Sequence, residues 1–172
     1  RIEEGPESVL ATVDAQIRHL LDRSGVPLSR ITSLGIGVPG PINLEAGMVD
    51  TPPIMPGWNR YPIRDHIAEK YNLPVSLNND AELGVLGEWA FGAGRQHDHL
   101  AYIKVGSGIG AGLLLNGQIY HGSTGSAGEI GHVTIDENGP LCNCGNRGCI
   151  EAMAGGVALA LEMERQVQKG HK

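Results

Sequence analysis

The first part of the chain repeats apolar residues with the period of an α-helix. In residues 6–25, PESVLATVDAQIRHLLDRSG, apolar side chains recur every three or four positions and share one face: Val9, Leu10, Val13, Ile17, Leu20 and Leu21. Pro6 suits the first turn of a helix, and Gly25 suits its end. The pattern predicts an amphipathic helix.

Further along, short apolar runs alternate with helical patterns. The pattern predicts strands at 31–40 (buried, and ending in a Pro-Gly-Pro turn), 75–78, 100–105, 111–122 and 132–136. It predicts helices at 61–72, 80–92 and, as one long closing helix, 150–168. Strands that alternate with helices indicate an α/β fold with a partly parallel sheet. We expect a boundary near Asn79 that separates residues 1–78 from residues 79–172.

Composition excludes some classes of function. The 172 residues carry a formal net charge of -6, which argues against binding of nucleic acid through a basic surface. No apolar run is long enough to span a bilayer, so we expect no membrane partner. Three cysteines without an apolar leader segment favour a reduced, cytoplasmic setting over a disulfide framework.

All three cysteines lie within eight residues, downstream of a histidine. His132, Cys142, Cys144 and Cys149 offer one imidazole and three thiolates, which is the ligand set of a closed structural zinc site. The stretch is polar and rich in glycine and has no core face, unlike the usual setting of buried cysteines. His121 or Asp136 is an alternative fourth ligand. The sequence predicts a zinc staple rather than a catalytic metal.

Three acidic positions are candidates for ligand binding. Glu129 precedes His132 by three residues and Glu151 follows Cys149 by two, so the metal would draw both carboxylates together, although solvated loop charges are the simpler interpretation. Asp80 follows Asn79 at the end of a predicted strand, where it either caps a helix or accepts a proton from a substrate hydroxyl.

A glycine loop, GSGIGAG at 106–112, lies between two predicted strands. Its backbone N–H groups can hold an anion such as phosphate, while a tight hairpin explains the glycines nearly as well. It is not a dinucleotide-binding fingerprint, because the continuation is strand-like.

Taken together, these motifs resemble the ROK family of repressors and sugar kinases. The specific blocks are GEIGH followed by CNCGNRGCIE, and NNDAELGVLGE, VGSGIGAG and GVPGPINLEAGMV also match in the right order. The resemblance implies a two-lobed, actin-like ATPase (ribonuclease-H-like) fold. The family's first phosphate hairpin and its adenosine-binding glycines have no match, so we expect an incomplete fold, part of a longer protein, that phosphorylates nothing by itself.

The resemblance also implies a role for individual residues. Asp80 matches the catalytic base, and the residues that match the sugar site are Asn79, Asp80, Glu129, His132 and Glu151. His132 also matches a zinc ligand, with Cys142, Cys144 and Cys149. The phosphate-binding match is Gly106, Ser107 and Gly108, in which serine replaces the commoner threonine and keeps the hydroxyl.

Two functions follow from the resemblance. In a regulator, the pocket senses a hexose or N-acetylhexosamine, and DNA is bound only by a winged helix-turn-helix domain outside this chain. In a glucokinase-like enzyme, Asp80 activates a sugar hydroxyl toward Mg-ATP. Lys104 stands where the kinases tend to carry threonine or glycine, which favours the regulator. We expect a homo-oligomer in either case.

Overall fold

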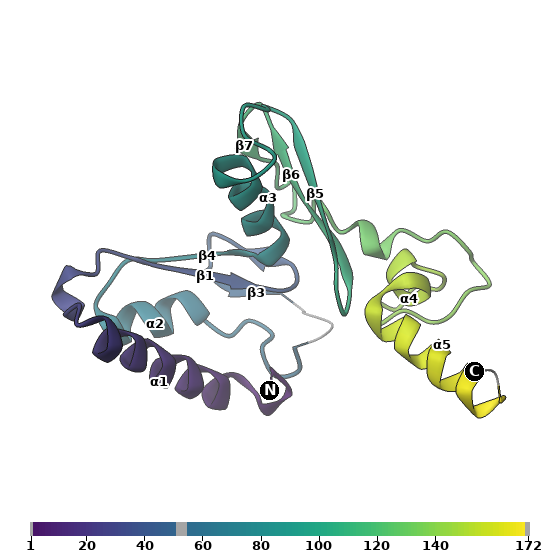
Figure 1. Cartoon of the computed structure of the whole chain (residues 1–172), viewed down its shortest axis with the longest axis horizontal. Coiled ribbons are helices and arrows are strands. Elements are labelled where there is room, and N and C mark those ends of the chain that lie inside the picture. Colours follow the sequence, from purple (N-terminus) through teal and green to yellow (C-terminus); the bar gives the residue numbers. More distant parts are fainter. Residues whose placement is uncertain (1, 51–54, 171–172) are drawn as a thin grey trace. The chain divides into compact units, whose positions relative to one another are not determined.

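The computed structural model describes residues 2–50 and 55–170, which form two compact units, Arg1–Asp80 and Ala81–Lys172. Both units contain helices and strands, as the sequence predicts (Figure 1). No helix in the described part of the chain is both long and apolar enough to cross a bilayer.

The first unit places helices against a parallel pair of strands. Its elements are η1 (Ile2–Glu4), α1 (Pro6–Ser24), η2 (Leu28–Arg30), β1 (Leu34–Val38), β2 (Ile42–Asn43), β3 (Met48–Val49), α2 (Ile63–Tyr71) and β4 (Val75–Asn79). Strands β1 and β4 pair in parallel, while β2 and β3 form a short antiparallel ladder. Both α1 and α2 lie on one side of the β1–β4 pair in Figure 1. The predicted partly parallel sheet is confirmed.

The core of this unit is built from α1, α2, the four strands and the loop before α2. Its buried residues are Leu10, Val38, Ile42, Val49, Met55, Trp58, Ile63, Ile67 and Leu77. The predicted limits of α1 are confirmed, since Pro6 is its first residue and Gly25 closes it in the left-handed conformation. Two residues of its predicted apolar face, Val13 and Leu20, are nevertheless exposed. Strand β1 is half-buried rather than fully buried, because Gly35 and Gly37 face outward.

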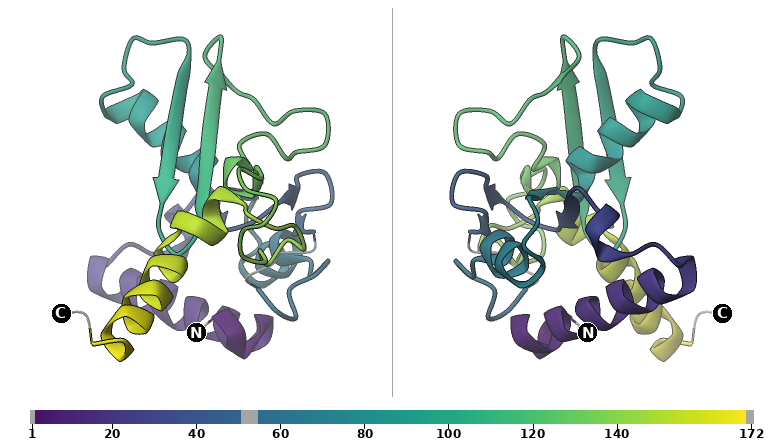
Figure 2. Two further views of the ribbon diagram at one scale, coloured as in Figure 1. Left: turned by 90° about the vertical axis from the view of Figure 1, so that its right-hand side faces the viewer. Right: turned by 90° about the vertical axis from the view of Figure 1, so that its left-hand side faces the viewer.

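The second unit is a hairpin sheet with a helix packed on it. Its elements are α3 (Asp80–Phe91, whose first residue ends the first unit), β5 (Leu100–Val105), β6 (Ile109–Leu115), β7 (Gln118–Ile119), η3 (Ile130–His132), α4 (Ile150–Ala154) and α5 (Gly156–Gln168). Strands β5, β6 and β7 are antiparallel in that order. Figure 2 shows β5 and β6 side by side. The single strand predicted at 111–122 is wrong: Asn116 and Gly117 both have positive φ and turn the chain back.

Two other predicted elements are also wrong. The closing helix is broken at Gly155, which is extended, with ψ of 158°. The next residue, Gly156, donates its backbone N–H to the carbonyl oxygen of Gly106, so a tertiary contact replaces the helical hydrogen bond. The strand predicted at 132–136 is absent. In its place η3 ends at His132, and Thr134 forms a single bridge with Cys149.

Candidate metal centre and ligand site

Backbone hydrogen bonds fold the cysteine-containing segment into a tight loop. The N–H of Cys142 donates to the carbonyl of Asn146 at 2.7 Å, and the N–H of Gly148 donates to that of Pro140 at 2.8 Å. Gly148 has φ of 61°, and a Cβ there would collide with the carbonyl of Asp136. The position therefore requires glycine, both for its dihedral angle and for space. These turns bring residues that are distant in sequence to one point.

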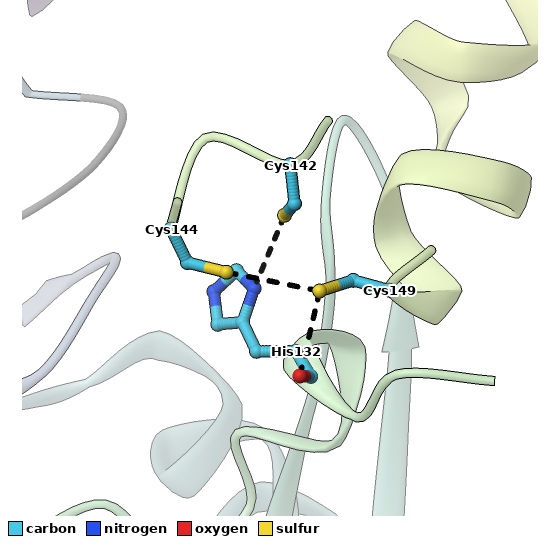
Figure 3. A group of neighbouring side chains, drawn as sticks. All are labelled: His132, Cys142, Cys144 and Cys149. Carbon is cyan, nitrogen blue, oxygen red and sulfur yellow. Dashed lines mark hydrogen bonds between the residues drawn. The ribbon is translucent and has the colours of Figure 1, made fainter. Parts of the chain in front are cut away.

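Four potential ligands meet inside this loop (Figure 3). They are His132, Cys142, Cys144 and Cys149, and their ligand atoms all lie within 4.8 Å of one another. The side chain of Cys149 is fully buried and that of Cys142 nearly so, whereas Cys144 is exposed. The group combines the sequence-predicted cysteines with the sequence-predicted histidine and could hold a metal ion.

The spacing of the ligand atoms fits a tetrahedral zinc ion. With Zn–S bonds of about 2.3 Å and a Zn–N bond of about 2.0 Å, a regular tetrahedron has edges of roughly 3.8 Å between sulfurs and roughly 3.5 Å between sulfur and nitrogen. Here Cys144 Sγ lies 3.7 Å from Cys149 Sγ, and Cys142 Sγ lies 3.6 Å from His132 Nδ1. The donor set and both edges therefore suit zinc.

The two nitrogens of His132 face different partners. Nδ1 faces the Cys142 sulfur, while Nε2 lies 3.8 Å from Glu129 Oε2, within ion-pair range. A metal-bound histidine usually directs its other nitrogen toward a carboxylate or carbonyl, which fixes the tautomer and the ring orientation. Glu129 is placed to act in this way. The metal centre and the predicted ligand site therefore share the His132 ring.

The two alternative fourth ligands are engaged elsewhere. His121 Nδ1 lies 2.6 Å from Glu82 Oε1, and Asp136 Oδ1 accepts the backbone N–H of Asn138 at 2.9 Å. Neither belongs to the cysteine cluster. Of the three candidates weighed from sequence, the structure brings only His132 to the thiols.

The thiols of the loop differ in acidity. Burial raises the pKa of Cys142 to about 11. Desolvation also works against ionisation of Cys144, but hydrogen bonds from the Asn146 backbone and from the other two thiols outweigh it, so the pKa of Cys144 is lowered. Metal ligation requires thiolates, so binding of a divalent ion would release protons from this cluster.

The remaining predicted residues lie on other elements. Asn79 ends β4, and its side-chain amide donates to the carbonyl of Gly40 at 3.0 Å. Asp80 follows directly as the first residue of α3. Both positions lie at the carboxyl end of β4, the ligand-facing edge in open α/β sheets.

Glu151 lies in the first turn of α4 and contacts the glycine loop. Its Oε2 accepts the backbone N–H of Ile109 at 2.8 Å. The loop itself is closed by the N–H of Gly106, which donates to the carbonyl of Gly108 at 2.9 Å. The structure thus brings Glu151 together with Gly106, Ser107 and Gly108. In the sequence, Glu151 and the glycine loop are two separate motifs.

Sequence reasoning missed the partner of His121. Glu82 is buried, at 6% relative exposure, on a helix whose other buried positions are apolar. Charged residues are almost never buried unless they are paired, and His121 supplies a partner. The sequence does hold a sign of this pair: Glu82 lies three residues before Val85, on the same apolar face of α3, where a charged side chain needs a partner.

Comparison with known proteins decides the family. A family model described as the ROK family matches residues 1–172. The chain belongs to the ROK family. A glucokinase from Thermotoga maritima is 39% identical to this ROK chain over 170 residues, which are 99% of this chain and 52% of the relative. A xylose repressor from Bacillus subtilis is 38% identical over 164 residues, or 95% of this chain and 42% of the relative.

A solved structure supports the same assignment. A ROK family glucokinase from Streptomyces griseus, in complex with glucose and AMPPNP, matches with a TM-score of 0.85 at 30% identity, over 96% of this chain and 51% of that one. The predicted α/β, actin-like fold class is confirmed. The ROK chain spans about half the length of these relatives, which include both kinases and repressors.

Proposed function

We propose that this ROK chain binds a hexose or N-acetylhexosamine in a site held by zinc, as the sugar-sensing part of a transcriptional regulator. The observation that carries the proposal is the shared His132 ring, with Nδ1 toward the thiols and Nε2 toward Glu129. A metal on the first nitrogen would fix the second nitrogen and the carboxylate beside it. These are the groups that a polyhydroxylated ligand needs.

The chemistry of the residues suits a sugar. Carboxylates such as those of Glu129 and Asp80 accept hydrogen bonds from sugar hydroxyls, and Asn79 supplies an amide that both donates and accepts. Charge-assisted hydrogen bonds of this kind are shorter and stronger than neutral ones. Zinc, when bound by the four ligands, supplies loop folding rather than catalysis. Together with the family resemblance, this chemistry is why we propose that the sugar is bound by Asn79, Asp80, Glu129, His132 and Glu151.

Two points favour the regulator. Lys104 lies near the end of β5, and the family resemblance implies that sugar kinases tend to carry threonine or glycine at this position. A xylose repressor matches 95% of the chain at 38% identity. DNA contact would then lie in a domain outside these 172 residues, because the net charge of -6 does not suit a phosphate backbone.

The second candidate function is an ATP-dependent sugar kinase. It is favoured by the 39% identity to a glucokinase and by the position of Asp80 after β4. In that function Asp80 accepts the proton of the attacking sugar hydroxyl, and the loop of Gly106, Ser107 and Gly108 holds phosphate of Mg-ATP. The serine hydroxyl and the backbone N–H groups are the donors that such a loop offers.

Titration calorimetry with a panel of hexoses and N-acetylhexosamines tests sugar binding, using the full-length product of the gene that encodes this chain. Glu129→Ala should weaken the affinity at least tenfold, because a charge-assisted hydrogen bond contributes about 1.5–3 kcal/mol. Glu137→Ala removes an exposed carboxylate of the same loop and should leave the affinity unchanged. Equal affinities for both variants would place the sugar elsewhere.

Sugar-dependent ATP consumption by the same protein separates the two functions. The regulator predicts no turnover above background and a change in operator affinity when the sugar is added. Steady ATP turnover that requires both the sugar and Asp80 would contradict the regulator function and support the kinase function.

A further inference from the structure

The glycine loop is held by the helical segment that follows the metal centre. Glu151 Oε2 accepts the N–H of Ile109, as described above, while two backbone N–H groups of α5 donate to loop carbonyls. Gly156 N lies 2.8 Å from Gly106 O, and Val157 N lies 3.3 Å from Ser107 O. Helix N-termini carry unsatisfied N–H groups, so the loop carbonyls complete this end of α5. The α4–α5 junction therefore supports the loop from one side.

The same segment is anchored at its start by the metal ligands. Cys149 is the residue before α4, and its thiol lies 3.5 Å from the carbonyl oxygen of His132. The N–H of Ile150 donates to the carbonyl of Val133 at 3.1 Å. Glu151 follows two residues after a buried ligand, so its backbone position is set by the cluster.

We propose that Glu151 is a positioning residue that transmits the folded state of the metal centre to the glycine loop. With metal bound, Cys149 and His132 fix the start of α4, and the Glu151 carboxylate holds the Ile109 amide. Without metal, the start of α4 loosens and the amide loses its acceptor. This inference rests on the proposed zinc-held site and adds to the sugar contact assigned to Glu151 a second role, carried by Oε2.

Gly108 offers an independent way to disturb the same contact. A Cβ built on Gly108 would collide with Glu151 Oε2, the mobile end of a side chain, so the carboxylate would move without a change in the backbone. A Cβ on Gly106 meets only the Lys104 side chain, at 3.9 Å. Gly106→Ala is thus a matched control in the same loop, since neither glycine has positive φ.

Amide hydrogen exchange at Ile109, followed by NMR with zinc and after chelation, tests the coupling. In the wild type, chelation should speed exchange at Ile109 by roughly 10-fold to 100-fold, the range for loss of a hydrogen bond to a charged acceptor. Glu151→Ala and Gly108→Ala should already exchange fast with zinc bound, while Glu151→Gln and Gly106→Ala should stay protected. The Tyr120 amide, which donates to Leu113 O at 2.8 Å, reports on unrelated opening of the sheet.

The outcomes separate this inference from the proposed function. Slow Ile109 exchange in Glu151→Ala overturns the coupling, even if this variant binds sugar more weakly. Slow Ile109 exchange in the wild type, after chelation that opens residues 142–149, also overturns it. Fast Ile109 exchange both in Glu151→Ala with zinc bound and in the wild type after chelation supports the coupling, even if the sugar titration fails. Fast exchange at Ile109 and Tyr120 alike would show general opening of the sheet and would also overturn it.

Discussion

Substitution of Gly112 by alanine should destabilise the second unit strongly, because this glycine is where α3 rests on the sheet. A Cβ on Gly112 would penetrate the carbonyl oxygen of Ala81, and would lie 3.0 Å from Val85 Cγ1. The obstacle is helix backbone, which cannot rotate away as a side chain can. Overpacking costs about 1–3 kcal/mol, and we expect a loss of about 3 kcal/mol in the free energy of unfolding because backbone must move.

Gly110→Ala is the matched control, on the same strand. A Cβ there has no heavy atom within 4 Å, so we expect a change of no more than about 0.5 kcal/mol. Urea denaturation followed by circular dichroism measures both variants. If Gly112→Ala costs no more than Gly110→Ala, then α3 does not pack on β6 as described. The packing matters for function because Asp80 is the first residue of this helix.

Three further predictions concern stability and chemistry. Tyr71 Oη donates to Asp14 Oδ1 at 2.6 Å, and this bond holds the pKa of Asp14 at about 2, below its ordinary 3.8, so its stabilisation should be complete above pH 4 and lost as the pH falls toward 2. Unfolding of Tyr71→Phe across this range should show a weaker pH dependence; an unchanged profile would contradict the assignment. Glu82→Ala should cost about 1–3 kcal/mol in urea unfolding, because it takes a partner from His121; no loss would mean that the pair is incidental. If the protein is a kinase, Asp80→Asn should lower turnover by roughly 10²–10⁴ with little change in sugar affinity, and a smaller loss would exclude Asp80 as the base.

Local sequence patterns are sufficient to predict many of the helices and strands of the fold. Pro6 and Gly25 marked the ends of α1 because their backbone preferences act locally. The sequence predicts a helix that starts at Asp80, and Asp80 is the first residue of α3. The cysteine spacing was also informative, since few structures other than a metal site gather three thiols in a polar loop.

The secondary-structure predictions are wrong where contacts between residues distant in sequence override the local preference for helix or strand. Residues 150–168 have a helical pattern throughout, and only the capture of the Gly106 carbonyl by Gly156 explains the break. His132 begins an apparently β-like stretch but ends a turn that delivers its ring to the thiols. The contact between Glu151 and Ile109 spans 42 residues, so no local pattern could predict it.

The zinc content of the purified chain is the decisive measurement, because the proposed sugar site is organised around the His132, Cys142, Cys144 and Cys149 cluster. Protein purified without chelator should be measured by elemental analysis, alongside a Cys149→Ser variant that lacks the fully buried ligand. We expect about one zinc ion per wild-type chain and strongly reduced zinc in the Cys149→Ser variant. Less than about a tenth of an ion per wild-type chain, or equal zinc in both proteins, would contradict it.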